Sequence, residues 1–139
     1  MNPLEREVRA KVYELFREGA VEITPEVLTE RGGWTREMVG QALVSLHAAH
    51  RIVLKPDGHV WMAHPFSSVD TGYRARIGER LWNANCAWDA LAILALLGDG
   101  RAEGPNGLTW GVRDGQVRPE GLVHLVVPVS RFWDDIGFT

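Results

Sequence analysis

The first 35 residues contain local signals for three separate helices. Apolar residues recur at helical spacing over residues 4–18, and Gly19 is typical of the end of such a helix. Thr24-Pro25 has the pattern of an N-cap followed by proline at the first helical position, and this second helix is expected to end near Arg31. Thr35 is placed to cap a third helix. A chain of 139 residues suits one domain, or two small ones that share a core.

A two-strand hairpin is predicted directly after the third helix. Ile52–Leu54 and Val60–Met62 are apolar runs separated by a turn that contains Asp57-Gly58. Three helices followed by a hairpin is the order of a winged helix-turn-helix. We therefore predict a winged-helix-like unit over residues 1–64 and a second unit over residues 65–139.

The second unit is predicted to hold a small sheet and one apolar helix. Residues 73–77 alternate as a strand does, and a helix is expected to begin near Cys86 and to end at Gly98. Residues 99–107 are rich in glycine and are expected to form a loop. The chain is thus predicted to be an α+β protein, with a small mixed or antiparallel sheet that carries the Cys86 helix.

The tail is expected to be rich in strands. Residues 108–113 and 116–118 flank Asp114-Gly115, a two-residue turn signal, and residues 122–129 are strongly apolar. Residues 131–135 are expected to form a short helical turn or loop. Residues 136–139 have the pattern of a strand that begins where the sequence ends, so we expect a further C-terminal piece after Thr139.

One cysteine in 139 residues excludes an intrachain disulfide framework and leaves a free thiol, which fits a reducing cytoplasm. The first residues lack an apolar signal core, and the longest apolar run, residues 90–97, is too short to span a bilayer. We therefore expect a cytoplasmic protein with no membrane partner. The sequence does not determine its oligomeric state.

The winged-helix order raises the hypothesis of a DNA-binding regulator, which the charges of the chain can test. The whole chain has a net charge of −3, and residues 1–64 contain eight Lys and Arg against nine Asp and Glu. Binding to DNA depends on a basic face that meets phosphates. A nucleic-acid partner is therefore not expected, and a DNA-binding regulator is kept only as an alternative.

Cys86 and Asp89 are the main candidate site residues. A spacing of three places both side chains on one face of a helix, and the first turn offers unpaired backbone N–H groups and the positive end of the helix dipole. Both features favour a thiolate, which binds soft metals, and Asp89 is placed to move a proton. The alternative is a buried cysteine that serves as a small apolar side chain.

Two further groups of residues are candidates. Trp82 and Trp88 flank the Cys86 turn and are expected either to wall an apolar substrate pocket or to pack in the core. His47 and His50 are three apart on a predicted helix, but no further spacing completes a zinc signature. No resident cofactor is predicted.

The segment from Gly78 to Leu91, GERLWNANCAWDAL, resembles the active-site segment of organomercurial (alkylmercury) lyases. In that family an aromatic residue precedes a Cys-Ala-x-Asp unit that opens a core helix. Pro65-Phe66-Ser67 is similar to the family's link into its catalytic part, and residues 132–139 resemble a tail segment of some members. The order of helices, hairpin, connection, cysteine helix and small sheet is similar as well.

The resemblance implies protonolytic cleavage of a carbon–mercury bond, which releases a hydrocarbon and Hg(II). It implies that Cys86 binds the mercury of a small organomercurial, as substrate and then as product, and that Asp89 relays a proton to the leaving carbon. Mercury is a soft metal that prefers thiolate ligands, and a carboxyl group held nearby delivers a proton without a diffusional encounter.

The chain departs from the family pattern in one respect, because the family uses two cysteines and this sequence has one. Three explanations remain open. The second thiol lies in a further C-terminal piece, or an external thiol or another chain supplies it, or the chain is a relative that has lost or changed the activity. The last explanation gives the alternative function: a non-catalytic protein that binds mercury or another thiophilic ligand through one thiol.

Overall fold

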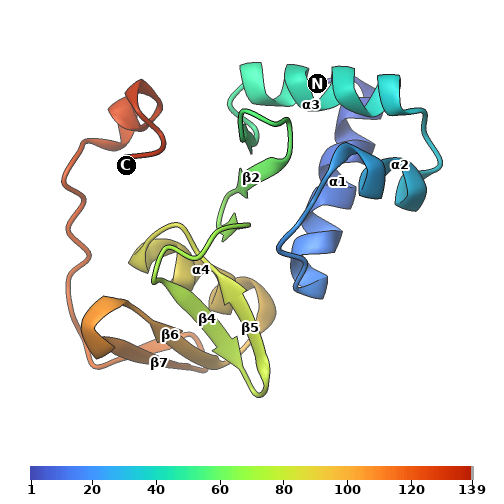
Figure 1. Cartoon of the computed structure of the whole chain (residues 1–139). Helices are drawn as coiled ribbons and strands as arrows, with labels where there is room; N and C mark the ends of the chain where they lie inside the picture. Colours follow the sequence, from blue (N-terminus) through green and yellow to red (C-terminus); the bar gives the residue numbers. More distant parts are fainter. Residues whose placement is uncertain (139) are drawn as a thin grey trace.

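The computed structural model describes residues 1–138 and has the predicted α+β architecture. Three helices and a three-stranded sheet form one end of the molecule, and one helix on a five-stranded sheet forms the other (Figure 1). The buried apolar side chains of both ends belong to a single core. The predicted boundary after residue 64 lies between the second and third strands of the small sheet.

The three N-terminal helices begin and end where the sequence signals predict. They are α1 (Pro3–Glu18), α2 (Pro25–Gly32) and α3 (Arg36–Ala48). The side chains of Thr24 and Thr35 accept hydrogen bonds from backbone N–H groups in the first turns of α2 and α3. These caps satisfy donors that have no partner within the helix.

The predicted hairpin is present and gains a third strand. Strands β1 (Val53–Leu54) and β2 (Val60–Ala63) pair antiparallel, and β3 (Phe66–Ser67) pairs with the other edge of β2. An isolated bridge joins Phe66 to Ala84, two residues before Cys86. The small sheet is therefore fixed directly to the segment that leads into the cysteine helix.

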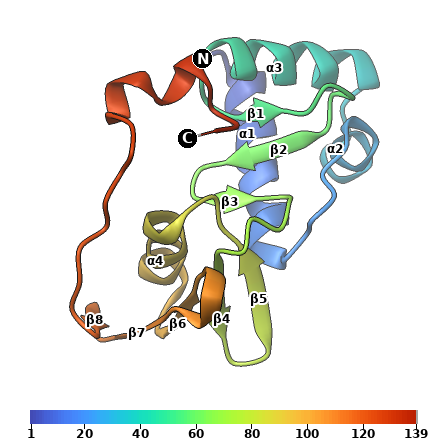
Figure 2. The same cartoon turned by 60° about the vertical axis from the view of Figure 1, so that its left-hand side comes forward.

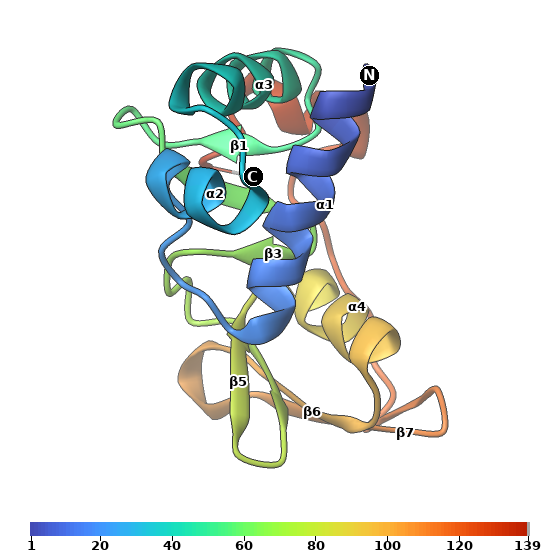
Figure 3. The same cartoon turned by 90° about the vertical axis from the view of Figure 1, so that its right-hand side faces the viewer.

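The second sheet is antiparallel throughout and has the order β5-β4-β6-β7-β8. Its strands are β4 (Arg74–Ile77), β5 (Arg80–Asn83), β6 (Gly100–Glu103), β7 (Thr109–Arg113) and β8 (Gln116–Arg118). Helix α4 (Ala87–Leu97) packs on β4 and β6. Figure 3 shows α4 between this sheet and the N-terminal helices.

The loop expected over residues 99–107 is wrong in its first half, because Gly100–Glu103 forms the central strand β6. Glycine lowers strand propensity, but here the fold needs it. A Cβ at Gly100 would lie 2.2 Å from the carbonyl oxygen of Arg76, so only glycine allows this close approach between strands. Residues 105–107 form a short 3-10 helix, η1 (Pro105–Gly107).

The tail contradicts the prediction of a strand over residues 122–129. These residues pair with no strand among the described residues and are largely exposed, with Leu122 fully exposed. The chain instead runs from β8 along one side of the molecule to α3 (Figure 2) and ends in η2 (Val129–Asp134), which confirms the helical turn. Residues 136–138 form a turn rather than a strand, and Thr139 lies outside the described residues.

Candidate functional site

Cys86 is the N-cap residue of α4. Its backbone is extended, and its carbonyl oxygen accepts the first helical hydrogen bond, from the N–H of Ala90 at 3.0 Å. Its thiol makes no capping hydrogen bond, and the residue is half-buried. The sulfur is therefore held at the start of a rigid helix, where it remains accessible.

Asp89 is buried in the first turn of the same helix. It is only 1% exposed, which is unusual for a carboxylate. Oδ2 accepts a hydrogen bond from Nδ2 of Asn85 at 2.9 Å, and the same amide group lies 3.4 Å from the carbonyl oxygen of Pro65. Asn85 thus links the carboxylate to the segment that joins β2 and β3.

His64 supplies the charged partner of Asp89. Its Nε2 lies 3.0 Å from Oδ1 of Asp89, which forms an ion pair when the imidazole is protonated. The two side chains differ sharply in burial, since that of His64 is 69% exposed and that of Asp89 is 1% exposed. His64 therefore joins a buried carboxylate to solvent.

Contacts on both sides of His64 hold it in this place. The Tyr13 hydroxyl on α1 donates a hydrogen bond of 2.9 Å to the His64 carbonyl oxygen. The bridge between Phe66 and Ala84 brings the following residues to the start of α4. His64 and Asp89 are 25 positions apart in the sequence, so tertiary packing brings the ion pair together.

The pKa values of two site residues are displaced. Burial is the main cause that raises the pKa of the Cys86 thiol, and the nearby Asp89 carboxylate raises it further. Backbone N–H groups of Asp89 and Trp88 act in the opposite direction but are outweighed. The prediction that the helix terminus makes Cys86 a ready thiolate is therefore wrong in its net direction.

The pKa of His64 is also raised, and its largest cause is the interaction with the Asp89 side chain. Partial burial opposes this effect. The imidazole of His64 consequently stays charged up to a higher pH than that of a free histidine. Its positive charge lies beside the Asp89 carboxylate.

An apolar pocket of about 590 Å³ opens at the thiol. This size suits a small organic molecule. The pocket is formed by the residues between α3 and β1, by β1 and β2, by His64, by the start of α4 and by the tail. Its lining residues are His50, Arg51, Ile52, Val53, Met62, His64, Cys86, Trp88, Val123, Leu125, Val129, Phe132, Trp133 and Ile136.

The tail covers this pocket and is attached by an aromatic contact. The rings of His50 and Trp133 are stacked with their centroids 4.0 Å apart and an angle of 4° between their planes. Figure 2 shows the end of the tail beside α3, after the long passage from β8. The same residues that failed to form a strand therefore supply one wall of the pocket.

The two candidate tryptophans lie in different places. Trp88 lines the pocket beside Cys86 and is 60% exposed. Trp82 is buried on β5, donates a hydrogen bond of 3.3 Å to the carbonyl oxygen of Arg17, and does not line the Cys86 pocket. Alternate residues on a strand point to opposite sides, and the side that Trp82 takes is the core.

The histidine pair does not gain further ligands. Nδ1 of His47 accepts a contact from the backbone N–H of Leu54 at 3.4 Å, while His50 stacks on Trp133. Within residues 1–138, no group of three or more His, Cys, Asp or Glu side chains is placed to hold a metal ion.

Two residues of the site carried no functional signal in the sequence. His64 was visible only as one histidine among five, and Asn85 only as the residue before the cysteine. The position of Asn85, four residues before Asp89 on a helical start, was a local signal for their contact. Nothing local indicated His64.

Comparisons with known proteins support the fold. The crystal structure of the mercury-bound form of MerB2 matches with a TM-score of 0.67 and 21% sequence identity, over 84% of this chain and 59% of that one. The chain thus spans about three fifths of that structure's length. No protein-family model matches the sequence. No curated protein matches it either. None of the helices within residues 1–138 has the length and apolar character that crossing a bilayer requires.

Proposed function

We propose that the protein cleaves the carbon–mercury bond of a small organomercurial by protonolysis, with Cys86 as mercury ligand and Asp89 as proton carrier. The observation that carries the proposal is a half-buried thiol that lines an apolar pocket and interacts with the buried carboxylate of Asp89. The fold shared with a mercury-bound protein supports the choice of metal.

The first step is capture of the mercury. The Cys86 sulfur bonds to the mercury of an R–Hg⁺ cation and releases its proton. Because burial raises the thiol pKa, this proton needs an acceptor close by, and the Asp89 carboxylate provides one. The apolar wall that includes Trp88 accommodates the organic group R.

The second step is protonolysis. Asp89 returns the same proton to the carbon bound to mercury, the carbon–mercury bond breaks, and the hydrocarbon R–H leaves. Hg(II) stays on the Cys86 sulfur. Proton and charge balance within the site, since the thiol's proton ends on carbon. Fixed geometry between donor and carbon replaces a diffusional encounter.

Product release needs a second sulfur and a new proton. An external thiol fills the place of a second protein cysteine and removes Hg(II). His64 then supplies the route by which solvent protons return to the buried Asp89 and from there to Cys86. The exposed imidazole at 3.0 Å from the carboxylate supports this role.

The test is mass spectrometry of the protein after exposure to a phenylmercury salt without added thiol, with benzene measured in the headspace of the same sample. The proposal expects a bare mercury adduct and released benzene. A Cys86→Ser variant, checked for folding by circular dichroism, should form no adduct. An intact phenylmercury adduct without benzene would overturn cleavage and favour the non-catalytic alternative, and an adduct on the serine variant would overturn the site.

The regulator alternative receives less support from the same structure. Arg36, the basic residue at the start of α3, is paired with Glu26 at 2.8 Å. The exposed face of that helix also includes Glu37 and Val44. This is not a surface that attracts phosphates.

A further inference from the structure

A row of arginines crosses the face of the five-stranded sheet that is opposite α4. Residues directly across from one another in the register are Arg76 on β4, Arg101 on β6, Gly111 on β7 and Arg118 on β8. Their neighbours in sequence, such as Ala75 and Ala102, point to the other side and are buried under α4. The row is therefore fixed by strand pairing.

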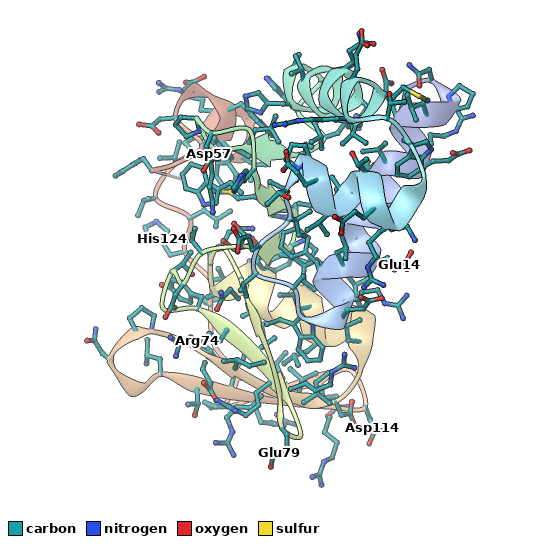
Figure 4. The ribbon with its side chains drawn as sticks, turned by 45° about the vertical axis from the view of Figure 1, so that its right-hand side comes forward. Glu14, Asp57, Arg74, Glu79, Asp114 and His124 are labelled. Carbon is teal, nitrogen blue, oxygen red and sulfur yellow. The ribbon has the colours of Figure 1, made fainter. Side chains whose placement is uncertain are left out.

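This outer face is open. Figures 1 and 3 show α4 on one side of the sheet and no helix on the other side among the described residues. Figure 4 shows Glu79 and Asp114 at the rim of the sheet that is farthest from the N-terminal helices. Arg101, Gly111 and Arg118 are exposed to solvent.

The arginines surround a hollow of about 790 Å³. Arg113 joins the three arginines of the row in its lining, which also includes one acidic residue, Asp114. Gly111 stands between Arg101 and Arg118 and has no side chain to fill the space. A Cβ built there would meet only the carbonyl oxygen of Arg118, at an ordinary 3.7 Å, so neither packing nor backbone conformation requires glycine.

The positive charges of this face are only partly compensated. Arg76 pairs with Glu103 and Arg118 with Glu120, at 2.8 and 2.7 Å. Arg101 and Arg113 make no ion pair within 4 Å among residues 1–138, although Arg101 lies close enough to Glu103 to help lower the pKa of that carboxyl group. Like charges directly opposite on neighbouring strands are destabilising, as with Arg76 and Arg101. An anion in the hollow would relieve this repulsion.

We infer that this hollow binds a compact anion that carries several linked phosphate groups. Arginine donates hydrogen bonds from a planar fork that matches phosphate oxygens. Strands lie about 4.8 Å apart, so the row spreads its charges over about 15 Å, more than one phosphate covers. No aromatic residue lines the hollow, so the platform on which nucleic-acid bases stack is missing.

The test is isothermal titration calorimetry of the full chain with inorganic tripolyphosphate at moderate salt. Citrate, orthophosphate and a thymidine octamer serve as the other ligands. We expect tripolyphosphate to bind at least about tenfold more tightly than each of them, since several charge-assisted hydrogen bonds form at once. Equal or tighter binding of citrate or of the octamer would overturn the assignment to a compact polyphosphate.

Two variants locate the site, and one variant serves as a control. Arg101→Gln should weaken tripolyphosphate binding about tenfold or more, because it removes a charged donor from the centre of the row. Gly111→Glu should abolish it by placing a carboxylate in the hollow. Arg36→Gln, on α3 at the other end of the molecule, should leave it unchanged. Unchanged binding in a folded Arg101→Gln variant would overturn the location.

Discussion

The two faces of the five-stranded sheet place charge in opposite settings. On the α4 side, one carboxylate is almost completely buried and meets a single imidazole. On the outer side, several arginines stand in solvent and share a shallow hollow. The pKa shifts at Cys86 and His64 belong to the first face, and both depend on burial or on the buried Asp89.

The difference teaches that burial, rather than the number of charges, creates reactive groups. Water screens exposed charges, so the outer face is suited to reversible attraction of an anion. The inner face excludes water from the Asp89 carboxylate. A proton on that carboxylate can therefore be exchanged only with the few groups beside it. A variant on the α4 side should therefore alter chemistry, and a matched variant on the outer side should not.

The largest expected effect is that of Asp89→Asn. The amide has nearly the same shape but cannot carry the proton, so hydrocarbon release should fall by at least about 100-fold. Cys86 should still capture the organomercurial, more slowly than in the parent, because the thiol proton is then lost to solvent. Headspace analysis and adduct mass measure the two steps separately. Asp99→Asn is the matched control, since Asp99 accepts a hydrogen bond from the Asp114 N–H in an exposed turn. An equal loss of hydrocarbon release in Asp89→Asn and Asp99→Asn would contradict a special role for the buried carboxylate.

A smaller effect is expected for His64→Gln. The glutamine keeps much of the side-chain volume but ends the proton route between Asp89 and solvent. Steady-state hydrocarbon release should fall several-fold, while release in a single turnover changes less because the thiol's own proton is used. His59→Gln is the control, because His59 lies near Asp57 in the hairpin turn.

The same variant has a second readout in thermal stability. The raised pKa of His64 means that its pairing with Asp89 stabilises the fold fully below the ordinary histidine pKa and is lost as pH rises through the raised value. The difference in Tm between the parent and His64→Gln should thus shrink from acidic to alkaline pH. A difference that is constant with pH would show that the ion pair is not its cause.

The smallest effect concerns the ionisation of Cys86. Because the folded state raises the thiol pKa, alkylation by iodoacetamide should be several-fold slower in the folded chain than in the denatured chain near neutral pH. Its pH profile should have a midpoint above that of the denatured chain. A midpoint below it would mean that the helix terminus dominates over burial.

Local signals accounted for much of the fold. The caps at Thr24 and Thr35, the turn at Asp114-Gly115 and the end of α4 at Gly98 were all predicted, because each depends on neighbouring residues. The failures at β6 and at residues 122–129 have a common reason. Pairing partners decide whether a segment becomes a strand, and glycine content or apolar character does not identify them.

By itself the sequence determined that a helix begins near Cys86 and carries Asp89 in its first turn, because the apolar run that follows and Gly98 are local signals. The expected place of Cys86 in the first turn is corrected to the N-cap, where its backbone is extended. Only the tertiary structure decided that His64 meets Asp89, that Trp82 faces the core, and that the tail closes the pocket. Burial and contacts between distant segments arise from packing of the whole chain, which no local pattern of residues encodes.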